Sequence, residues 1–213
     1  QWSDVQGESL DDDILRPCAN PFSPEGGLRL VTGNIGRAIV KVSAVDPAHH
    51  AIKAPAVVFR SQQAFVDAFN NDELERDFVA VVTQQGPRAN GMPELHKLTP
   101  YLGVLQNRGV KVALLTDGRM SGASGKVLAA IQVTPEAVDG GKIALIRDGD
   151  MVTIDAGSGE LSLDDAAALE QREAEANGDG GQTGMGRELF AAFRERATGA
   201  EQGASLFGTR GDR

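Results

Sequence analysis

Short runs of strand-forming residues alternate with segments of helical spacing along most of this chain. Five runs have the composition and length of strands: LRLVTG (28–33), AIVKVSAV (38–45), APAVVF (54–59), DFVAVVTQQ (77–85) and VKVALLTD (110–117). Between the third and fourth, Phe65, Val66 and Phe69 share one face of a predicted helix over 62–69, which Ser61 would cap. This alternation predicts an α/β fold, in which polar loops at strand ends usually hold the ligand.

The rest of the chain predicts a mixture of helices and strands. The expected elements are a helix over 93–109, a helical turn in GKVLAAI (125–131), strands within 142–163, and helices over 164–175 and 187–197. Pro93 suits the first position of its helix, whereas Pro100 should distort or divide it. The expected domain covers 21–175, with an acidic connector over 1–20 before it. A glycine-rich break, a helix and a tail follow over 176–213.

The charge and the cysteine count exclude several functions. The 213 residues carry 21 Lys and Arg against 30 Asp and Glu, and the formal charge of −9 repels nucleic acid and anionic membranes. No apolar run reaches the length of a membrane span and no signal segment is recognisable, so we expect a cytoplasmic protein. Cys18 is the single cysteine, which excludes an internal disulfide, and we interpret it as a structural thiol.

The loop QQGPRANGMPELHK (84–97) is dense in side chains of the kind that bind ligands. Within it, Glu94 either complements the dipole of the predicted helix or provides a carboxylate ligand for Mg²⁺, a hard ion that prefers oxygen. His96 and Lys97 either contact a substrate or occupy an exposed helix face. The residue types alone leave both interpretations open.

A second loop, TDGRMSGASGKV (116–127), contains more small residues than a turn needs. Small residues let backbone N–H groups approach an anion closely. The loop departs from the P-loop pattern at Met120 and Val127, which argues against an ATPase. Ser121 is either a generic loop serine or a nucleophile or base, and Arg119 either fixes the loop or binds a substrate.

These two loops carry a resemblance to a known family. TDGRMSGASGKVLAAIQVTPEAVDGG and GPRANGMPELHKLTPYLGVL resemble two C-terminal signatures of the dihydroxy-acid and 6-phosphogluconate dehydratase family. NPFSPEGGLRLVTGNIGRAIVKVSAV and TGMGRELFAAFRERATGAEQGAS resemble specifically the 6-phosphogluconate branch of that family. The resemblance extends from about residue 16 to residue 206.

The resemblance implies a fold and a set of cofactors. The corresponding part of the family's proteins is a swivelling β/β/α domain, an α/β fold with a partly open β-barrel core flanked by helices. Members are normally longer and hold an iron–sulfur cluster, expected to be 4Fe–4S, through cysteines in an N-terminal portion. We therefore expect a C-terminal domain that works with its own N-terminal domain in a homodimer, uses Mg²⁺ and that cluster, and is inactive alone.

The resemblance also implies roles for individual residues. Glu94 corresponds to a Mg²⁺ ligand, and Ser121 corresponds to the base that takes a proton from C2 of the substrate. Five further residues are weaker candidates for substrate binding: Arg119, Ser124, Lys126, Asn34 and His96. Lys126 either meets the substrate phosphate or caps neighbouring carbonyls, and Asn34 either lines the site or is an ordinary turn residue.

The implied reaction is the removal of water from 6-phosphogluconate, a sugar-acid phosphate, to give 2-keto-3-deoxy-6-phosphogluconate in the Entner–Doudoroff route. Since serine is a poor base, such a site needs a cation and several amide donors around Ser121. One alternative is a dihydroxy-acid or other sugar-acid dehydratase of the same family. An alternative of a different class is a metabolite-binding domain without catalysis.

Overall fold

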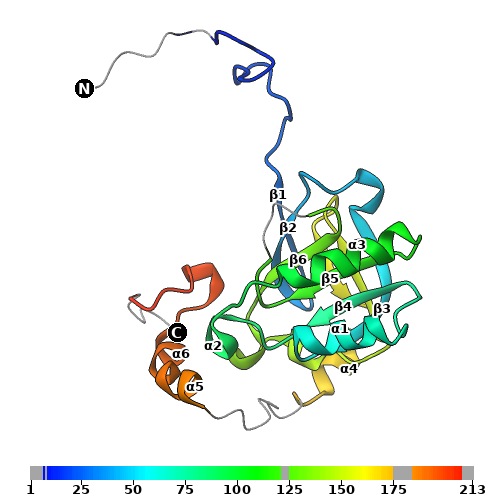
Figure 1. Ribbon diagram of the computed structural model, residues 1–213, viewed down its shortest axis with the longest axis vertical. Helices are drawn as coiled ribbons and strands as arrows, with labels where there is room; N and C mark the ends of the chain where they lie inside the picture. The colour runs from blue at the N-terminus through cyan, green and yellow to red at the C-terminus, as the bar shows by residue number, and fades with distance from the viewer. Residues whose placement is uncertain (1–6, 8, 121–124, 175–183, 208–213) are drawn as a thin grey trace.

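The computed structural model of this protein describes residues 7, 9–120, 125–174 and 184–207, and within them eight strands form a closed barrel (Figure 1). The strands are β1 (Leu28–Gly33), β2 (Gly36–Lys41), β3 (Ala51–Phe59), β4 (Phe78–Val82), β5 (Val112–Thr116), β6 (Leu128–Thr134), β7 (Met151–Asp155) and β8 (Glu160–Leu163). Around the ring their order is β1-β2-β6-β5-β4-β3-β7-β8.

One half of the barrel is parallel. β3, β4, β5 and β6 run in the same direction, so their carboxyl ends meet at one rim. Antiparallel pairs attach β2 and β7 to this half, and β1 and β8 extend it. The ring closes where Thr32 of β1 pairs with Glu160 of β8. The predicted α/β fold with a barrel core flanked by helices is confirmed, although the ring is closed rather than partly open.

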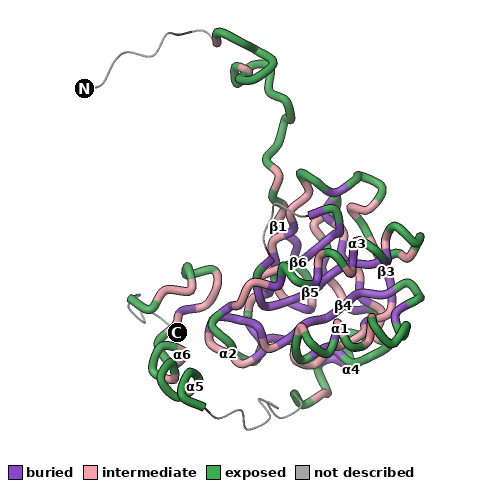
Figure 2. Tube along the Cα trace, viewed as in Figure 1, coloured by how far each residue is buried: buried purple, intermediate pink, exposed green. Residues whose placement is uncertain are grey.

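Two apolar cores lie on either side of the parallel strands. In β4, Val79 and Val81 belong to the core inside the barrel, whereas Phe78, Ala80 and Val82 belong to an outer core. Because both faces of the strand are covered, its sequence is a continuous apolar run rather than an alternating one. Figure 2 shows the buried residues concentrated along these strands.

The helices that complete the outer core are α1 (Gln62–Asn70) and α3 (Thr99–Asn107). Ser61 caps α1 as predicted, since its hydroxyl accepts the N–H of Ala64 at 3.1 Å. Phe65 of α1 and Leu102 and Leu105 of α3 are buried against the barrel. The short helices η1 (Pro47–His49), η4 (Ala137–Asp139) and η5 (Lys142–Leu145) occupy connections between strands.

The helix predicted over 93–109 begins later than expected. A 3₁₀ turn, η2 (His96–Leu98), precedes α3, and the backbone before it forms a β-bridge between Glu94 and Arg119. Pro93 is therefore not the first residue of a helix. Pro100 lies in the first turn of α3, where its missing N–H is not needed, so it starts the helix rather than dividing it.

The helical turn predicted in GKVLAAI (125–131) is wrong, because this segment leads into strand β6. Its alanines suit a helix, but β6 lies between β2 and β5 and pairs with both, and tertiary pairing outweighs local preference. Within 142–163 the first segment is the 3₁₀ helix η5, and only β7 and β8 are strands. The helix predicted over 164–175 is shorter, α4 (Ala166–Gln171).

The two ends of the chain leave the barrel differently. The N-terminal segment extends away from it, and Cys18 there is exposed (Figure 1).

The helix predicted over 187–197 is divided into α5 (Met185–Leu189) and α6 (Ala191–Arg196), followed by η6 (Ala200–Gln202). Arg187 donates to the Ala89 carbonyl at 3.5 Å, and Arg37 pairs with Glu201. No helix in the described ranges is long and apolar enough to cross a membrane.

Candidate functional site at the carboxyl rim of the parallel strands

Asp117 joins three neighbouring strand ends at this rim. It follows β5 and is fully buried. One carboxylate oxygen accepts the N–H of Gln85, after β4, at 2.8 Å, and the other accepts the N–H of Ala137, after β6, at 3.0 Å. Burial raises the pKa of Asp117 above its ordinary value, and these backbone N–H groups only partly offset that rise. Asp117 thus fixes the loop geometry.

Glu136 holds a second buried carboxylate against the short helix α2 (Pro87–Asn90). Its oxygens accept the N–H groups of Arg88, at 3.1 and 3.2 Å, and of Ala89, at 3.1 Å. Burial raises the pKa of Glu136, while these N–H groups lower it in part. Gly86 permits the approach, because a Cβ there would lie 2.1 Å from a Glu136 carboxylate oxygen.

The contact between Glu94 and Arg119 joins the loop over 84–97 to the loop over 116–127. The two residues form an isolated parallel β-bridge, and the Leu95 N–H donates to the Arg119 carbonyl at 3.0 Å. Their side chains form an ion pair, with Nη1 of Arg119 3.2 Å from Oε2 of Glu94. The Arg119 Nε donates to the Met92 carbonyl at 2.9 Å. The Glu94 side chain keeps 34% of its surface exposed, so its carboxylate is accessible to a ligand.

Of the other predicted site residues, the structure describes His96, Lys126 and Asn34. His96 is exposed in η2, and Lys126 is exposed with its carbonyl accepting from Gln106 at 3.2 Å. Asn34 uses its amide to donate to the Leu163 carbonyl at 2.7 Å and to accept the Leu163 N–H at 2.8 Å, which is the role of a turn residue. Ser121 and Ser124 lie outside the described residues.

A cavity of about 490 Å³ opens beside the Glu94 loop, between the ends of β3 and β4 and the C-terminal segment. Five of its lining residues are cationic, namely Arg60, Arg88, Lys97, Arg187 and Arg194, and no described residue that lines it is acidic. Arg88 and Lys97 belong to the loop over 84–97 that is dense in ligand-type side chains, whereas the other three are far apart in the chain and are not predicted as site residues. The one available signal was the branch-specific stretch that contains Arg187 and Arg194.

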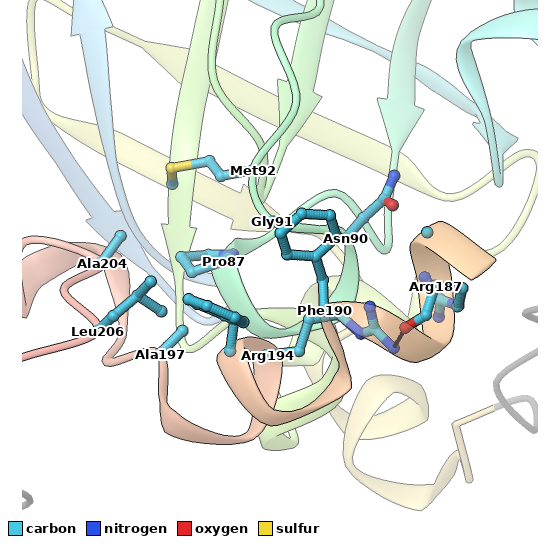
Figure 3. A pocket seen from close by; sticks show the side chains of 12 residues that line it. Pro87, Asn90, Gly91, Met92, Arg187, Phe190, Arg194, Ala197, Ala204 and Leu206 are labelled. Carbon is cyan, nitrogen blue, oxygen red and sulfur yellow. Dashed lines mark hydrogen bonds between the residues drawn. The ribbon is translucent and has the colours of Figure 1, made fainter.

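A second, more apolar cavity of about 650 Å³ lies between α2 and the C-terminal segment (Figure 3). Phe190, Phe193 and Leu206 line it together with Pro87 and Met92. Three residues, Asn90, Arg187 and Arg194, line both cavities. The C-terminal segment therefore forms a wall of each cavity.

In the part of the chain that the structure describes, His, Cys, Asp and Glu side chains are not clustered as a metal site requires. Among the described residues, no group of three or more His, Cys, Asp and Glu side chains is arranged to hold a metal ion. Glu94 fits one position of a magnesium site, as an accessible carboxylate oxygen donor. An iron–sulfur cluster does not fit this chain, because a cluster needs several thiolates and the sequence contains only Cys18.

Comparison with known proteins agrees with the signatures in these loops. The family described as "dihydroxy-acid/6-phosphogluconate dehydratase C-terminal" matches residues 13–204. A phosphogluconate dehydratase of Pseudomonas aeruginosa is 58% identical over 97% of this chain and 34% of its own length. One from Escherichia coli K12 is 52% identical over 96% of this chain and 34% of its own.

A dihydroxy-acid dehydratase of Sulfurisphaera tokodaii is 42% identical over 72% of this chain and 27% of its own length. The chain thus spans about a third of the length of the phosphogluconate dehydratases that it matches. The resemblance predicted from the sequence is confirmed. From the signatures, the fold and these relatives together, the chain belongs to the dihydroxy-acid/6-phosphogluconate dehydratase family, whose C-terminal region it matches.

Proposed function

We propose that this chain is the C-terminal part of a hydro-lyase that removes water from 6-phosphogluconate to give 2-keto-3-deoxy-6-phosphogluconate. The observation that carries the proposal is the contact between Glu94 and Arg119, which joins the two loops that bear the family's signatures. The phosphogluconate dehydratases among the relatives support the choice of substrate.

In this proposal Ser121 takes the proton from C2. The C3–O bond then breaks, the hydroxyl leaves as water after protonation, and the resulting enol rearranges to the 2-keto acid. Ser121 is two positions after Arg119 in the chain, and Arg119 is the residue that contacts Glu94. A serine acts as a base only if its alkoxide is stabilised, and a guanidinium fixed by Glu94 and the Met92 carbonyl supplies positive charge for that purpose.

Glu94 would bind Mg²⁺ as one carboxylate ligand, and the remaining ligands would come from outside the described residues. When bound, Mg²⁺ and an iron–sulfur cluster supply Lewis acids for the substrate's oxygens. The cluster would be held by the N-terminal portion that the longer relatives possess, in a homodimeric cytoplasmic enzyme. The buried carboxylates of Asp117 and Glu136 keep the rim loops in position for this chemistry.

The test uses the complete enzyme, in which this chain is joined to its N-terminal portion. Ser121→Ala should lower kcat for 6-phosphogluconate by about 10²- to 10⁴-fold, the usual contribution of a general base. Glu94→Gln should raise the Mg²⁺ concentration for half-maximal activity roughly tenfold or more, since it removes a charged oxygen ligand. Ser43→Ala, an exposed position after β2 at the other end of the barrel, is the matched control.

The outcome separates the alternatives. Full activity of Ser121→Ala would refute its role as the base. Faster turnover of another sugar acid or dihydroxy acid would point to a different dehydratase of the same family. A complete protein with its cluster and Mg²⁺ intact that binds 6-phosphogluconate but forms no 2-keto acid would be a metabolite-binding protein instead.

A further inference from the structure

The cationic cavity beside Glu94 has no role in the proton transfer just described. It gathers five of the chain's 21 Lys and Arg residues in a protein whose formal charge is −9. We propose that this cavity is the subsite for the phosphate of the substrate, with Arg187 and Arg194 as the residues that select a phosphorylated sugar acid. This inference rests on the proposed function, because it concerns where the phosphate of the same substrate binds.

The guanidinium groups that line the cavity from the C-terminal segment donate to backbone carbonyls. Arg194 donates from Nη2 to the Arg187 carbonyl at 2.8 Å, a contact drawn in Figure 3, and Arg187 donates from Nη1 to the Ala89 carbonyl at 3.5 Å. A carbonyl orients a guanidinium without cancelling its charge. Each guanidinium has five N–H donors, and their planar arrangement suits two oxygens of a phosphate.

The remaining cations of the cavity come from outside the C-terminal segment. Arg60 follows β3 directly and Lys97 lies three residues after Glu94, and both are exposed toward solvent. Arg88, in α2, is half-buried and paired with Asp139, which reduces its contribution to the field. Positive charges from three separate segments of the chain therefore line one cavity, as binding a dianionic group requires.

Gln62 connects this cavity to the proposed reaction centre. Its side chain lines the cavity and donates from Nε2 to the backbone carbonyl of Glu94 at 3.4 Å. Its amide oxygen is buried, and no described residue donates a hydrogen bond to it. A buried acceptor of this kind favours a ligand with a donor group. The hydroxyls between the carboxylate and the phosphate of a sugar acid provide such donors.

The position of Arg187 and Arg194 explains how the subsite confers specificity. Both belong to the stretch that resembles the 6-phosphogluconate branch specifically, whereas Glu94 and Arg119 belong to the signatures of the whole family. The residues that would act on the carboxylate end of the sugar acid thus come from the barrel rim. The residues that would recognise the phosphate come from the segment packed beside it.

The experiment measures equilibrium binding of 6-phosphogluconate and of gluconate to the complete enzyme. The variants are Arg187→Met, Arg194→Met and the double variant, with Arg60→Met as an independent change outside the C-terminal segment. Arg196→Met is the matched control, because Arg196 is on the same helix α6 but does not line the cavity. Circular dichroism melting establishes that each variant is folded.

Each single change at Arg187 or Arg194 should weaken binding of 6-phosphogluconate about tenfold or more, as expected for a charge-assisted hydrogen bond. Gluconate binding should change less than about twofold, and Arg196→Met should match the unchanged enzyme. Inorganic phosphate should compete with 6-phosphogluconate in the unchanged enzyme but not in the double variant. Arg194→Lys should retain part of the affinity, since it keeps the charge.

Equal weakening for both ligands, or no weakening for either, would overturn the proposal. Because the readout is binding, it is independent of turnover. If the enzyme forms no 2-keto acid but the variants discriminate between the two ligands as stated, the dehydratase proposal fails while the phosphate subsite stands. If turnover occurs but the variants do not discriminate between the two ligands, the phosphate subsite fails while the dehydratase proposal stands.

Discussion

At the scale of single residues, buried carboxylates hold the candidate site together. The two oxygens of Asp117 serve the loops after β4 and β6, and those of Glu136 serve the first turn of α2. Each acceptor satisfies a backbone N–H that would otherwise be buried without a partner. The rim loops are therefore positioned by side chains rather than by regular secondary structure.

Replacing Asp117 by Ala should destabilise the protein markedly. The change leaves the N–H groups of Gln85 and Ala137 without their acceptor, and each buried orphan costs about 1–3 kcal/mol, so we expect a loss of about 3 kcal/mol in the free energy of unfolding. Urea denaturation monitored by circular dichroism measures it. Asp12→Ala, at an exposed position, should change it by less than about 0.5 kcal/mol. Equal stability of the two variants would show that Asp117 does not fix the rim.

Individual site residues were more predictable than their contacts. Glu94 and Arg119 were singled out separately, each with a structural and a functional interpretation. Their ion pair depends on a β-bridge between segments 25 positions apart, and no local pattern encodes such a pairing. For Asn34 the interpretation as a turn residue agrees with its two hydrogen bonds to Leu163.

At the scale of elements, α4 is anchored to the barrel by the residue that follows it. Arg172 donates to both oxygens of Asp150 and to the Leu145 carbonyl at 3.1 Å, and the two side chains are only 16% and 12% exposed. Burial alone would raise the pKa of Asp150, but the hydrogen bonds from Arg172 and from the Arg147 N–H bring it below its ordinary value.

Arg172→Met should lower the free energy of unfolding by about 2 kcal/mol at neutral pH, from the loss of charge-assisted hydrogen bonds. Because folding lowers the pKa of Asp150, this stabilisation is fully present above the ordinary value of 3.8 and is lost as the pH falls through the folded pKa. The difference between variant and parent, measured by denaturation at several pH values, should therefore shrink below about pH 4.

Lys142→Met provides the control for that experiment. Lys142, in η5, pairs with Glu170 of α4, but these two side chains are more exposed than those of Arg172 and Asp150. Exposed ion pairs contribute little, so the loss should stay below about 1 kcal/mol. A larger effect here than at Arg172, or an Arg172→Met effect that persists in acid, would contradict the proposed anchoring.

The elements themselves were predictable where one pattern dominated. Strand β1 and helix α1 match the predicted 28–33 and, to within one residue, 62–69, because composition and capping agree there. The predictions failed where local preference and tertiary pairing disagree. Glu94 follows a proline that suits a helix start, and Ala129 and Ala130 favour a helix, yet both segments are recruited into β pairing.

At the scale of the whole molecule, the C-terminal segment contributes walls rather than core. Both apolar cores end at Leu169 or earlier in the chain, and neither α5 nor α6 has a buried residue. Arg187 and Arg194 nevertheless line both cavities, and Phe190 and Phe193 line the apolar one. No sequence pattern predicts that Arg60 and Arg194 share a cavity, because their proximity depends on how this segment packs against α2.

Removing residues 175–213 should leave the barrel folded. Since none of the described residues of the deleted part, 184–207, belongs to either core, the cooperative thermal transition should persist, with a loss of about 1–2 kcal/mol from surface contacts such as the pair of Arg37 with Glu201. Circular dichroism melting of the chain ending at Ala174 measures this. Loss of a cooperative transition would show instead that the segment is integral to the fold.

The closure of the ring through Thr32 and Glu160 determines where the barrel can open. That seam has one residue pair, whereas β4 and β5 share five. In the order of strands around the ring, β4 and β5 lie directly across from the seam. A fluctuation that parts β1 from β8 would turn the cylinder into a curved open sheet without parting the strands whose ends carry Asp117 and Gln85. The barrel can therefore open at this seam while the rim that carries the candidate site keeps its strand pairing on the other side.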